Sequence, residues 1–592
     1  MGNKKKARKT LKRQFRGNQH TCPTTTIESV ASKITELPNT DSETNVTPGP
    51  SAKKIKMQSN ILPEERNLNN TNSFILMDTS ILFAFLSATV ACDVCSQFTL
   101  SVELDDERRS GFAHEIILRC SNCNEWETRF KTSREDCGHK EVNLRMVSFA
   151  RAIGRGYNAL DMFTLYLNSP PPMTRNNYKK MFTTVAEASK KVAMESMEKA
   201  VTELREISEN SEDDVVDCSV SVDGTWQRRG HSSHHGVVTA ISVENGKCMD
   251  TEILSNICKA CQHWEKRKGT VEYESWRLQH NCKINHAGSA GAMEAAGAVN
   301  IFMRSVETRN IRYTQYLGDG DSSSYKKVVD SKPYGEKPIE KLECVGHVQK
   351  RCGTRLRRLV NDNKGRKLDD GKGISGIGRL TSKKIDTLQN YFGFAIRQNS
   401  GNLDQMKADV KAVLFHVGSS EKIPRHDYCP DNSWCKYKLD PKSYKHKNGL
   451  PEAVIKFLEP IFVDLANEEL LRKCTHGKTQ NRNENLNKLI WERCPKELYV
   501  EKETIEEAVY SAISYFNDGA VSIIKCLEYL GIEPGYYTYK KCFDRDKKRI
   551  RFSDIKSSEA AKKRRKTLRA IKKGFLDTTA ASEGDMYTSG GH

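Results

Sequence analysis

The pattern of apolar and polar positions changes along the chain and marks its first segments. Residues 98–107 alternate with a period of two, and together with the apolar stretches at 74–95 and 114–123 they predict short strands. Residues 142–210 instead repeat apolar positions at spacings of three and four, with a break at three consecutive prolines, which predicts helices. We therefore expect a small β module at 73–141 and a helical, candidate DNA-binding region at 142–212.

Strand-like patterns return after an acidic linker. Residues 215–226 and 236–254 have strand character and are joined by a polar, hairpin-like turn, whereas 292–307 has the composition of a helix. Residues 311–321 form a strand that ends in acidic residues, residues 362–470 favour helices, and 479–491 fit an amphipathic helix. This order predicts an α/β fold with a mixed sheet, 213–361 and 471–540, that a mainly helical insertion, 362–470, interrupts.

The composition and net charge predict the kind of partner that the protein binds and the compartment in which it is found. With 95 Lys and Arg against 76 Asp and Glu, the formal charge is +19, which predicts binding to a polyanion such as nucleic acid. No uninterrupted apolar run reaches about 18 residues and the N-terminus has no signal-peptide core, so we expect a soluble, intracellular protein without a membrane partner.

Both ends of the chain are basic. Residues 1–72 are polar and poor in aromatic residues, which predicts a disordered basic tail, and 541–592 form a basic C-terminal tail that is helical in part. The basic clusters of the first tail fit nuclear-import signals or contacts to the DNA backbone, and equally a solvated tail with no specific role.

Nineteen cysteines in an intracellular chain favour zinc over disulfides. Two Cys-x2-Cys pairs have the spacing of a four-thiolate zinc ribbon: Cys92, Cys95, Cys120 and Cys123. Two buried cysteine pairs are the alternative, and Cys137 and His139 are alternative ligands.

Two further groups contain cysteine and histidine. Within an insert at 255–290, a structural zinc site is expected from Cys258, Cys261, Cys282 and His286, with His263 and His280 competing for the fourth position. A third group has looser spacing and stays open as a metal site: His426, Cys429 and Cys435, with Cys474 and His476 further on.

Three acidic motifs carry the candidate catalytic chemistry. Asp223 lies in SVDGTW, Asp319 and Asp321 lie in YLGDGDSSSY, and Glu484 lies in NRNENLNKLIW. A Gly turn after Asp223 is expected to let the backbone approach a ligand. If the carboxylates converge, they supply the oxygen ligands that two Mg²⁺ or Mn²⁺ ions need for phosphodiester chemistry. A turn residue, a cap or an exposed helical glutamate is the simpler interpretation of each acid alone.

Together, the phrases VDGTW, NHAGSAGAME, YLGDGDSSSY, KLECVGHVQKR and TQNRNENLN resemble the transposases of Mutator-like elements over residues 73–540. This resemblance implies an RNase H-like core with an Asp-Asp-Glu triad. Asp223 would be the first acid, Asp319 or else Asp321 the second, and Glu484 the third. It also implies that Cys344 and His347 form a structural Cys-x2-His element.

The resemblance further implies a reaction and partners. The reaction would be metal-dependent strand cleavage and strand transfer on double-stranded DNA, at transposon terminal repeats and target DNA, in the nucleus and by a homo-oligomer. Candidate DNA-binding residues follow the Cys-x2-His element: Arg351, Arg355, Arg357 and Arg358. A solvated helix face is their alternative. A catalytically inactive, domesticated DNA-binding regulator and an RNase H-fold nuclease without strand transfer are the competing functions.

Overall fold

The computed structural model divides the chain into two units, Met1–Thr47 and Pro48–His592. The residues it describes all belong to the second unit: 49–55, 73–123, 126–136, 138–208, 214–228, 233–319, 323–429, 435–446, 449–565 and 567–568. Most of the predicted N-terminal tail, and Asp321, lie outside the described residues. Within that tail, Pro50–Lys54 form the short helix α2, which packs on α20 (Tyr536–Ser557), where Gly49 N donates to Asp554 Oδ1 at 2.6 Å.

The first described module is a three-stranded antiparallel sheet in the order β1-β2-β3: Leu100–Leu104, Glu115–Cys120 and Glu127–Lys131. Two short strands follow, β4 (Glu135–Asp136) and β5 (His139–Lys140). The prediction of strands from residue 74 was wrong over Thr79–Thr89, which form helix α3. Asp78 caps this helix by accepting a hydrogen bond from Ser80 N at 2.8 Å, a start signal that outweighs the apolar run.

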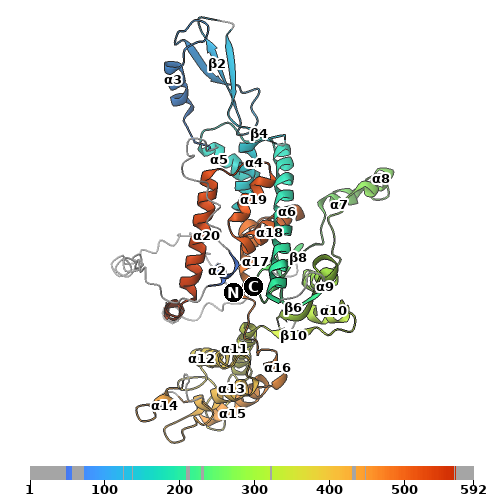
Figure 1. The fold of residues 1–592 in the computed structure, drawn as a ribbon. Helices are drawn as coiled ribbons and strands as arrows, with labels where there is room; N and C mark the ends of the chain where they lie inside the picture. The colour runs from blue at the N-terminus through green and yellow to red at the C-terminus, as the bar shows by residue number, and fades with distance from the viewer. Residues whose placement is uncertain are drawn as a thin grey trace, which may run out of the picture. The chain divides into compact units, whose positions relative to one another are not determined.

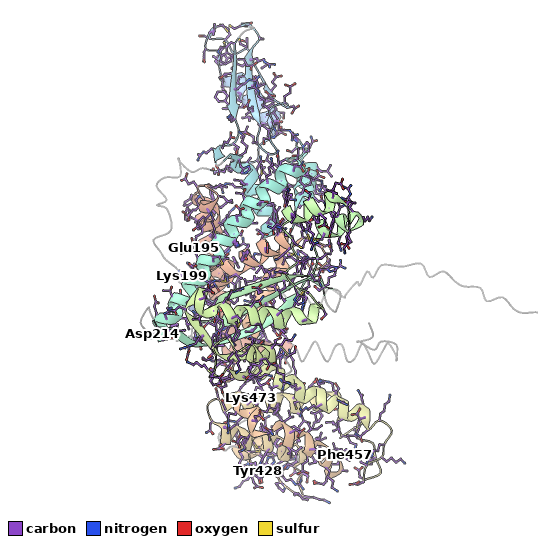
Figure 2. The ribbon with its side chains drawn as sticks, turned by 90° about the vertical axis from the view of Figure 1, so that its right-hand side faces the viewer. Glu195, Lys199, Asp214, Tyr428, Phe457 and Lys473 are labelled. Atoms are coloured by element: carbon purple, nitrogen blue, oxygen red, sulfur yellow. The ribbon has the colours of Figure 1, made fainter. Side chains whose placement is uncertain are left out.

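Three helices follow as predicted from the spacing of apolar residues: α4 (Glu141–Ala152), α5 (Tyr157–Tyr166) and α6 (Arg175–Ser208). The long helix α6, on which Figure 2 labels Glu195 and Lys199, packs against α18 (Lys502–Asp518) and α19 (Val521–Tyr529). Its buried Met197 shares a hydrophobic core with Ile513 of α18, so the helical region is packed against a helix from the later part of the chain.

A mixed five-stranded sheet has the order β10-β9-β6-β7-β8, and Figure 1 labels its strands β6, β8 and β10. The strands are β6 (Val216–Trp226), β7 (His235–Ser242), β8 (Cys248–Ser255), β9 (Ile311–Gly318) and β10 (Glu340–Glu343). β6, β7 and β8 pair antiparallel, whereas β9 runs parallel to both β6 and β10. The expected α/β fold with a mixed sheet is confirmed, and residues 236–254 form two strands rather than one.

Helices cover both faces of this sheet. On one face, α9 (Ala290–Arg309) packs Ile301 and Phe302 against Val220, and α10 (Ser323–Asp330) follows β9. On the other face, α17 (Asn481–Arg493) and α18 pack Leu486 and Ile513 against Val237. Successive side chains of each strand point to opposite faces of the sheet, and both faces are buried, as expected for a sheet between two helical layers.

Between β10 and α17 the chain forms a block of helices with its own core. These are α11 (Val345–Asp362), α12 (Ser382–Gln398), α13 (Leu403–Gly418), α14 (Lys436–Leu439), α15 (Glu452–Leu465) and α16 (Glu468–Arg472). Because α17 then returns to the sheet, the helices interrupt it. No helix within the described ranges is long and apolar enough to cross a membrane.

Candidate active site and cysteine clusters

Two neighbouring parallel strands bring Asp223 and Asp319 together. In the register of β6 and β9, Ser221 lies opposite Leu317, and the same register continued by two residues places Asp223 opposite Asp319. Asp319 directly follows the end of β9, as expected. Asp223, in contrast, lies inside β6, because Gly224 continues to pair with Val238 and forms no turn.

Polar side chains dock α17 along β6. The hydrogen bonds join Gln480 Nε2 to Val222 O at 2.9 Å, Asn483 Nδ2 to Ser221 O at 3.1 Å, Asn487 Nδ2 to Asp223 Oδ2 at 2.7 Å and Trp491 Nε1 to Thr225 Oγ1 at 2.8 Å. Residues three and four apart are neighbours on a helix surface, so Glu484 stands beside both Gln480 and Asn487. The docked helix thus carries the third predicted acid to the strand that carries the first.

The electrostatics of Asp223 report the same convergence. Burial raises the pKa of Asp223 to about 7, and the negative charges of Glu294, Glu484 and Asp319 raise it further, against the hydrogen bond from Asn487. Like charges disfavour ionisation only over short distances, so these carboxylates share one neighbourhood. An added cation would relieve the repulsion.

Glu294 is an acid of this site that the sequence interpretation missed. It lies on α9, accepts a hydrogen bond from Ser324 Oγ at 3.1 Å, and has its pKa raised by burial and by Asp319. A Cβ atom on Gly224 would lie 2.7 Å from Glu294 Cγ, so glycine leaves the space that this side chain fills. The available signal was that Glu294 is the only charged residue between 290 and 303.

The Cys-x2-His element connects the second acid to the docked helix. Cys344 follows the last residue of β10 and precedes α11, and its Sγ accepts a hydrogen bond from Gln480 N at 3.4 Å. His347 Nδ1 lies 2.9 Å from Asp319 Oδ2. Cys344 and His347 therefore hold the start of α17 and the carboxylate of Asp319, respectively, from the same segment of chain.

The donor set fits a hard divalent cation. The carboxylates of Asp223, Asp319, Glu484 and Glu294 are accompanied by Asn487 Oδ1, a buried oxygen without a hydrogen-bond partner among the described residues. Mg²⁺ and Mn²⁺ prefer such oxygen ligands, and an unsatisfied buried oxygen is costly unless something binds it. A divalent cation bound here would neutralise the carboxylates and bind the unpaired oxygen, so the arrangement fits a metal site.

The four predicted DNA-binding arginines all have acidic partners in their own chain. Arg351 NH2 lies 2.5 Å from Glu343 Oε2. The other pairs are Arg355 with Asp464 at 3.6 Å, Arg357 with Asp386 at 2.7 Å and Arg358 with Asp362 at 3.6 Å. DNA contact by these residues stays a prediction, and it would require the pairs to be shared or opened.

The first cysteine cluster lies in the β1–β3 module and joins the four predicted thiols. All four Sγ atoms lie within 4.8 Å of one another, and Cys95 Sγ and Cys120 Sγ are 3.7 Å apart. A hydrogen bond with Thr99 Oγ1 at 3.2 Å is the main cause that lowers the pKa of Cys120 to about 6. His139 forms β5 outside this cluster, and Cys137 lies outside the described residues. Four converging sulfurs fit a zinc ion.

The second cluster requires a correction of one ligand. It contains Cys258, Cys261 and Cys282 as predicted, but the fourth member is His280 rather than His286. His280 Nε2 lies 3.4 Å from Cys258 Sγ and 3.3 Å from Cys261 Sγ, at the end of α8 (Val271–Gln279). His286 Nε2 instead lies 3.3 Å from Ser289 O. Sequence spacing alone does not determine which of two histidines six residues apart reaches the cysteines, because this depends on how the insert folds.

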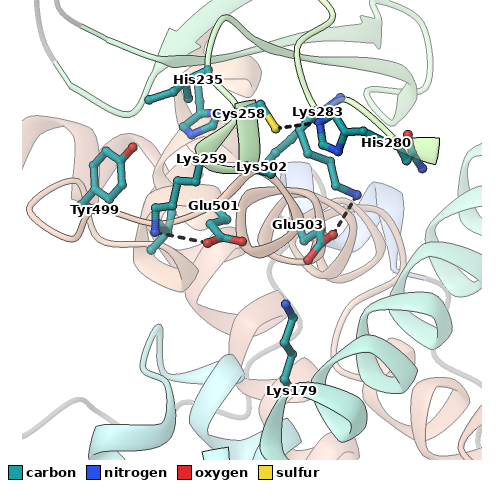
Figure 3. Close-up of a pocket in the computed structure, with 14 residues that line it drawn as sticks. Lys179, His235, Cys258, Lys259, His280, Lys283, Tyr499, Glu501, Lys502 and Glu503 are labelled. Carbon is teal, nitrogen blue, oxygen red and sulfur yellow. Dashed lines mark hydrogen bonds and ion pairs between the residues drawn. The ribbon is translucent and has the colours of Figure 1, made fainter. Parts of the chain in front are cut away.

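Figure 3 shows the pocket beside this second cluster. Two lysines of the insert pair with glutamates before and at the start of α18: Lys259 with Glu501 at 3.2 Å and Lys283 with Glu503 at 2.8 Å. None of the four acids of the candidate active site lines this pocket. Its described residues anchor the insert to the helices next to the sheet.

The third group is only partly brought together. His426, Cys429 and Cys435 converge, and their companion is His416 of α13. Cys474 belongs to the core of the helical insertion, and His476 Nε2 lies 3.1 Å from Glu343 O. Neither of these two residues is part of the cluster.

A comparison with protein families identifies the family of the chain. A family model described as Mutator-like transposase matches residues 73–435. A comparison with curated proteins finds no match.

Proposed function

Because the chain belongs to the Mutator-like transposase family, we propose that it is an Asp-Asp-Glu DNA transposase that cuts and joins DNA strands at transposon ends. The observation that carries this proposal is the meeting of Asp223 on β6, Asp319 after β9 and Glu484 on α17. The mixed sheet, with helices on both faces and a helical block before α17, supports an RNase H-like core.

In this proposal, Asp223, Asp319 and Glu484 hold two Mg²⁺ or Mn²⁺ ions. Such ions activate a water or a 3′-hydroxyl and stabilise the leaving oxygen of an in-line displacement. Glu294 is close enough to Asp223 to add negative charge, and Asp321 remains an alternative second acid outside the described residues.

The residues around the acids act by positioning them. Asn487 holds Asp223 through its amide nitrogen, and His347 holds Asp319. Arg351 NH2, 3.9 Å from Asp319 Oδ1, is placed to balance part of the charge when the cations are absent. Fixed carboxylate orientation matters because supporting contacts around a metal site commonly contribute 10- to 100-fold, approximately, in affinity or activity.

The substrate in this proposal is double-stranded DNA, with terminal repeats and target DNA bound in the nucleus by a homo-oligomer that holds two ends. The formal charge of +19 supports a polyanionic partner. Structural zinc in the first two cysteine clusters would fix the β module, whose buried core is small, and the insert, whose helices Lys259–Trp264 and Val271–Gln279 bury no residue.

The test compares two glutamates of the same helix. Purified protein is incubated with Mn²⁺ and DNA that carries the inverted repeats flanking its gene, and cut and joined products are separated on gels. Glu484→Gln should lower both activities by at least about 100-fold, because it removes a direct metal ligand. Glu492→Gln, an exposed glutamate two turns further along α17, should leave both unchanged.

Other products would contradict the proposal in distinct ways. Cut ends without joined products would identify a nuclease that lacks strand transfer. Binding of the repeats with neither product would identify a DNA-binding regulator. Equal activity of Glu484→Gln and wild type would remove Glu484 from the catalytic site.

A further inference from the structure

We infer that the helical insertion binds its own structural zinc ion through His416, His426, Cys429 and Cys435. These residues come from the end of α13, from the loop that follows it and from the residue preceding α14. The inference concerns a site apart from the acids and does not depend on the proposed DNA chemistry.

The distances between the donor atoms match the edges of a zinc tetrahedron. Cys429 Sγ lies 3.6 Å from His416 Nδ1 and 3.7 Å from His426 Nδ1, and Cys435 Sγ lies 3.7 Å and 3.5 Å from the same two atoms. Zn–S bonds of about 2.3 Å and Zn–N bonds of about 2.05 Å at tetrahedral angles give N···S edges of about 3.55 Å. Two nitrogens and two sulfurs in this geometry select zinc over Mg²⁺ or Ca²⁺.

The histidine contact is otherwise hard to explain. His416 Nδ1 and His426 Nδ1 face each other at 3.1 Å, with both thiols packed against them. A proton shared between the two histidine nitrogens would explain only the contact between them. A cation would bind both nitrogens and both thiol sulfurs. The site is also closed from solvent, since His426, Cys429 and Cys435 are buried.

Contacts behind His426 fix the ring in the orientation that a ligand needs. Its second nitrogen, Nε2, lies 2.9 Å from Ser419 Oγ and 2.9 Å from His446 Nε2. His446 Nδ1 in turn lies 3.2 Å from Glu421 Oε2. Metal-binding histidines usually have such an outer partner, because a proton kept on one nitrogen leaves the other free for the metal.

The surrounding segment has little else to hold it. Its buried hydrophobic cluster consists of Ala412, Cys429 and Cys435. Ile423 and Leu439 are exposed, and α14 has only four residues. Aromatic contacts complete the described packing, including Tyr428, labelled in Figure 2, whose ring stacks on Phe415 at 4.9 Å. A segment with so small a core commonly needs a metal or disulfide staple, and four ligands with no open position make the zinc structural.

The test uses two equally buried cysteines, Cys435 and Cys474, that both lie in the block of chain between β10 and α17. Zinc per chain is measured by mass spectrometry of the metal in full-length wild type, Cys435→Ala and Cys474→Ala. Cys435→Ala should contain one zinc fewer per chain than wild type. Cys474→Ala should contain the same number as wild type, because Cys474 is fully buried in the helical core and outside the cluster.

A second measurement needs no variant and remains informative if Cys435→Ala does not fold. Wild type is alkylated with and without a chelator, and the modified cysteines are identified by peptide mapping. Cys429 and Cys435 should become reactive only after chelation, whereas Cys474 should stay protected. An unchanged zinc count in folded Cys435→Ala, a disulfide between Cys429 and Cys435, or reactivity that ignores the chelator would overturn the inference.

Discussion

Asp223 shows how one residue links the fold to the chemistry. Its backbone is an ordinary part of β6, yet its carboxyl group is largely buried and faces three other acids. In the absence of cations, the folded protein would be more stable with a hydrophobic or amide side chain at this position. A carboxylate that destabilises the folded protein is typical of a functional site, because strongly shifted pKa values cluster where a charged group takes part in binding or catalysis.

This cost predicts a pH-dependent gain of stability for Asp223→Asn when no Mg²⁺ or Mn²⁺ is added. The folded pKa of about 7 exceeds the ordinary value of 3.8, so the folded wild type binds more protons between these values. Its free energy of unfolding should therefore fall as pH rises towards 7, and the variant should not share this loss. Between pH 5 and pH 8 the advantage of Asp223→Asn should grow by roughly 2 to 3 kcal/mol, measured by urea denaturation.

Asp369→Asn serves as the control, since Asp369 is exposed on the helical insertion. Its difference from wild type should be the same at both pH values. Addition of Mn²⁺ should raise the melting temperature of wild type more than that of Asp223→Asn. A pH-independent difference for Asp223→Asn would show that its charge is not penalised in the folded chain.

At the scale of elements, a buried ion pair joins α4 to α18. Arg151 Nε lies 2.8 Å from Glu507 Oε2, and the two side chains are 6% and 3% exposed. The same guanidinium donates to the carbonyl oxygens of Arg155, Arg493 and Thr504, so its charge is fully surrounded. The helical region before the sheet is thus tied to the helices after it by a contact that water does not screen.

Removal of one partner should be far more damaging than removal of both. Glu507→Ala leaves a buried, unpaired guanidinium and should lower the free energy of unfolding by about 3 to 5 kcal/mol. The double variant Arg151→Met, Glu507→Leu should recover most of this loss, because apolar residues of similar volume fill the space. Denaturant titrations of both proteins provide the comparison.

The matched control is Glu506→Ala, one residue away on α18. Glu506 pairs with Lys502 at 3.6 Å and is 34% exposed, so its removal should cost less than about 1 kcal/mol. If Glu507→Ala is equally mild, water enters the site and the pair does not join the two helices.

The elements also show what the sequence could and could not predict. Strand alternation and helix spacing located β6, β9 and α17, because these elements bury one or two regular faces. Helix α3 was missed since an apolar run of this length fits a strand as well as a helix, and only the cap at Asp78 separates them.

The candidate site was predictable where neighbours in sequence or in adjacent strands carry it. Asp223 and Asp319 follow from strand pairing, whereas Glu294 reaches them from a helix whose rotation no local pattern specifies. His416 was missed as a cluster member for the same reason, and His280 was named only as an alternative to His286. The partners of His416 lie 10 to 19 residues away, and those of His280 include Cys258 and Cys261, 22 and 19 residues away, so only the folded loops bring these atoms together.

For the whole molecule, the distribution of charge matters more than its sum. The arginines after the Cys-x2-His element are all paired with acids, so they add little net positive potential. Helix α20 instead presents Lys541, Arg545 and Lys548 at helical spacings of four and three, and all three are exposed. Within the described ranges no acid forms an ion pair with them. This face is therefore the better candidate for the phosphate backbone of DNA.

Two triple variants that remove equal charge distinguish these surfaces. Each neutralised phosphate contact contributes about 0.9 to the slope of log affinity against log salt concentration. Replacement of Lys541, Arg545 and Lys548 by alanine should therefore reduce the slope by about 3, measured by fluorescence anisotropy with duplex DNA at several NaCl concentrations. Replacement of Arg355, Arg357 and Arg358 should change it by less than about 1, because their charges already meet carboxylates. The reverse order would place the DNA along α11 and show that its ion pairs open on binding.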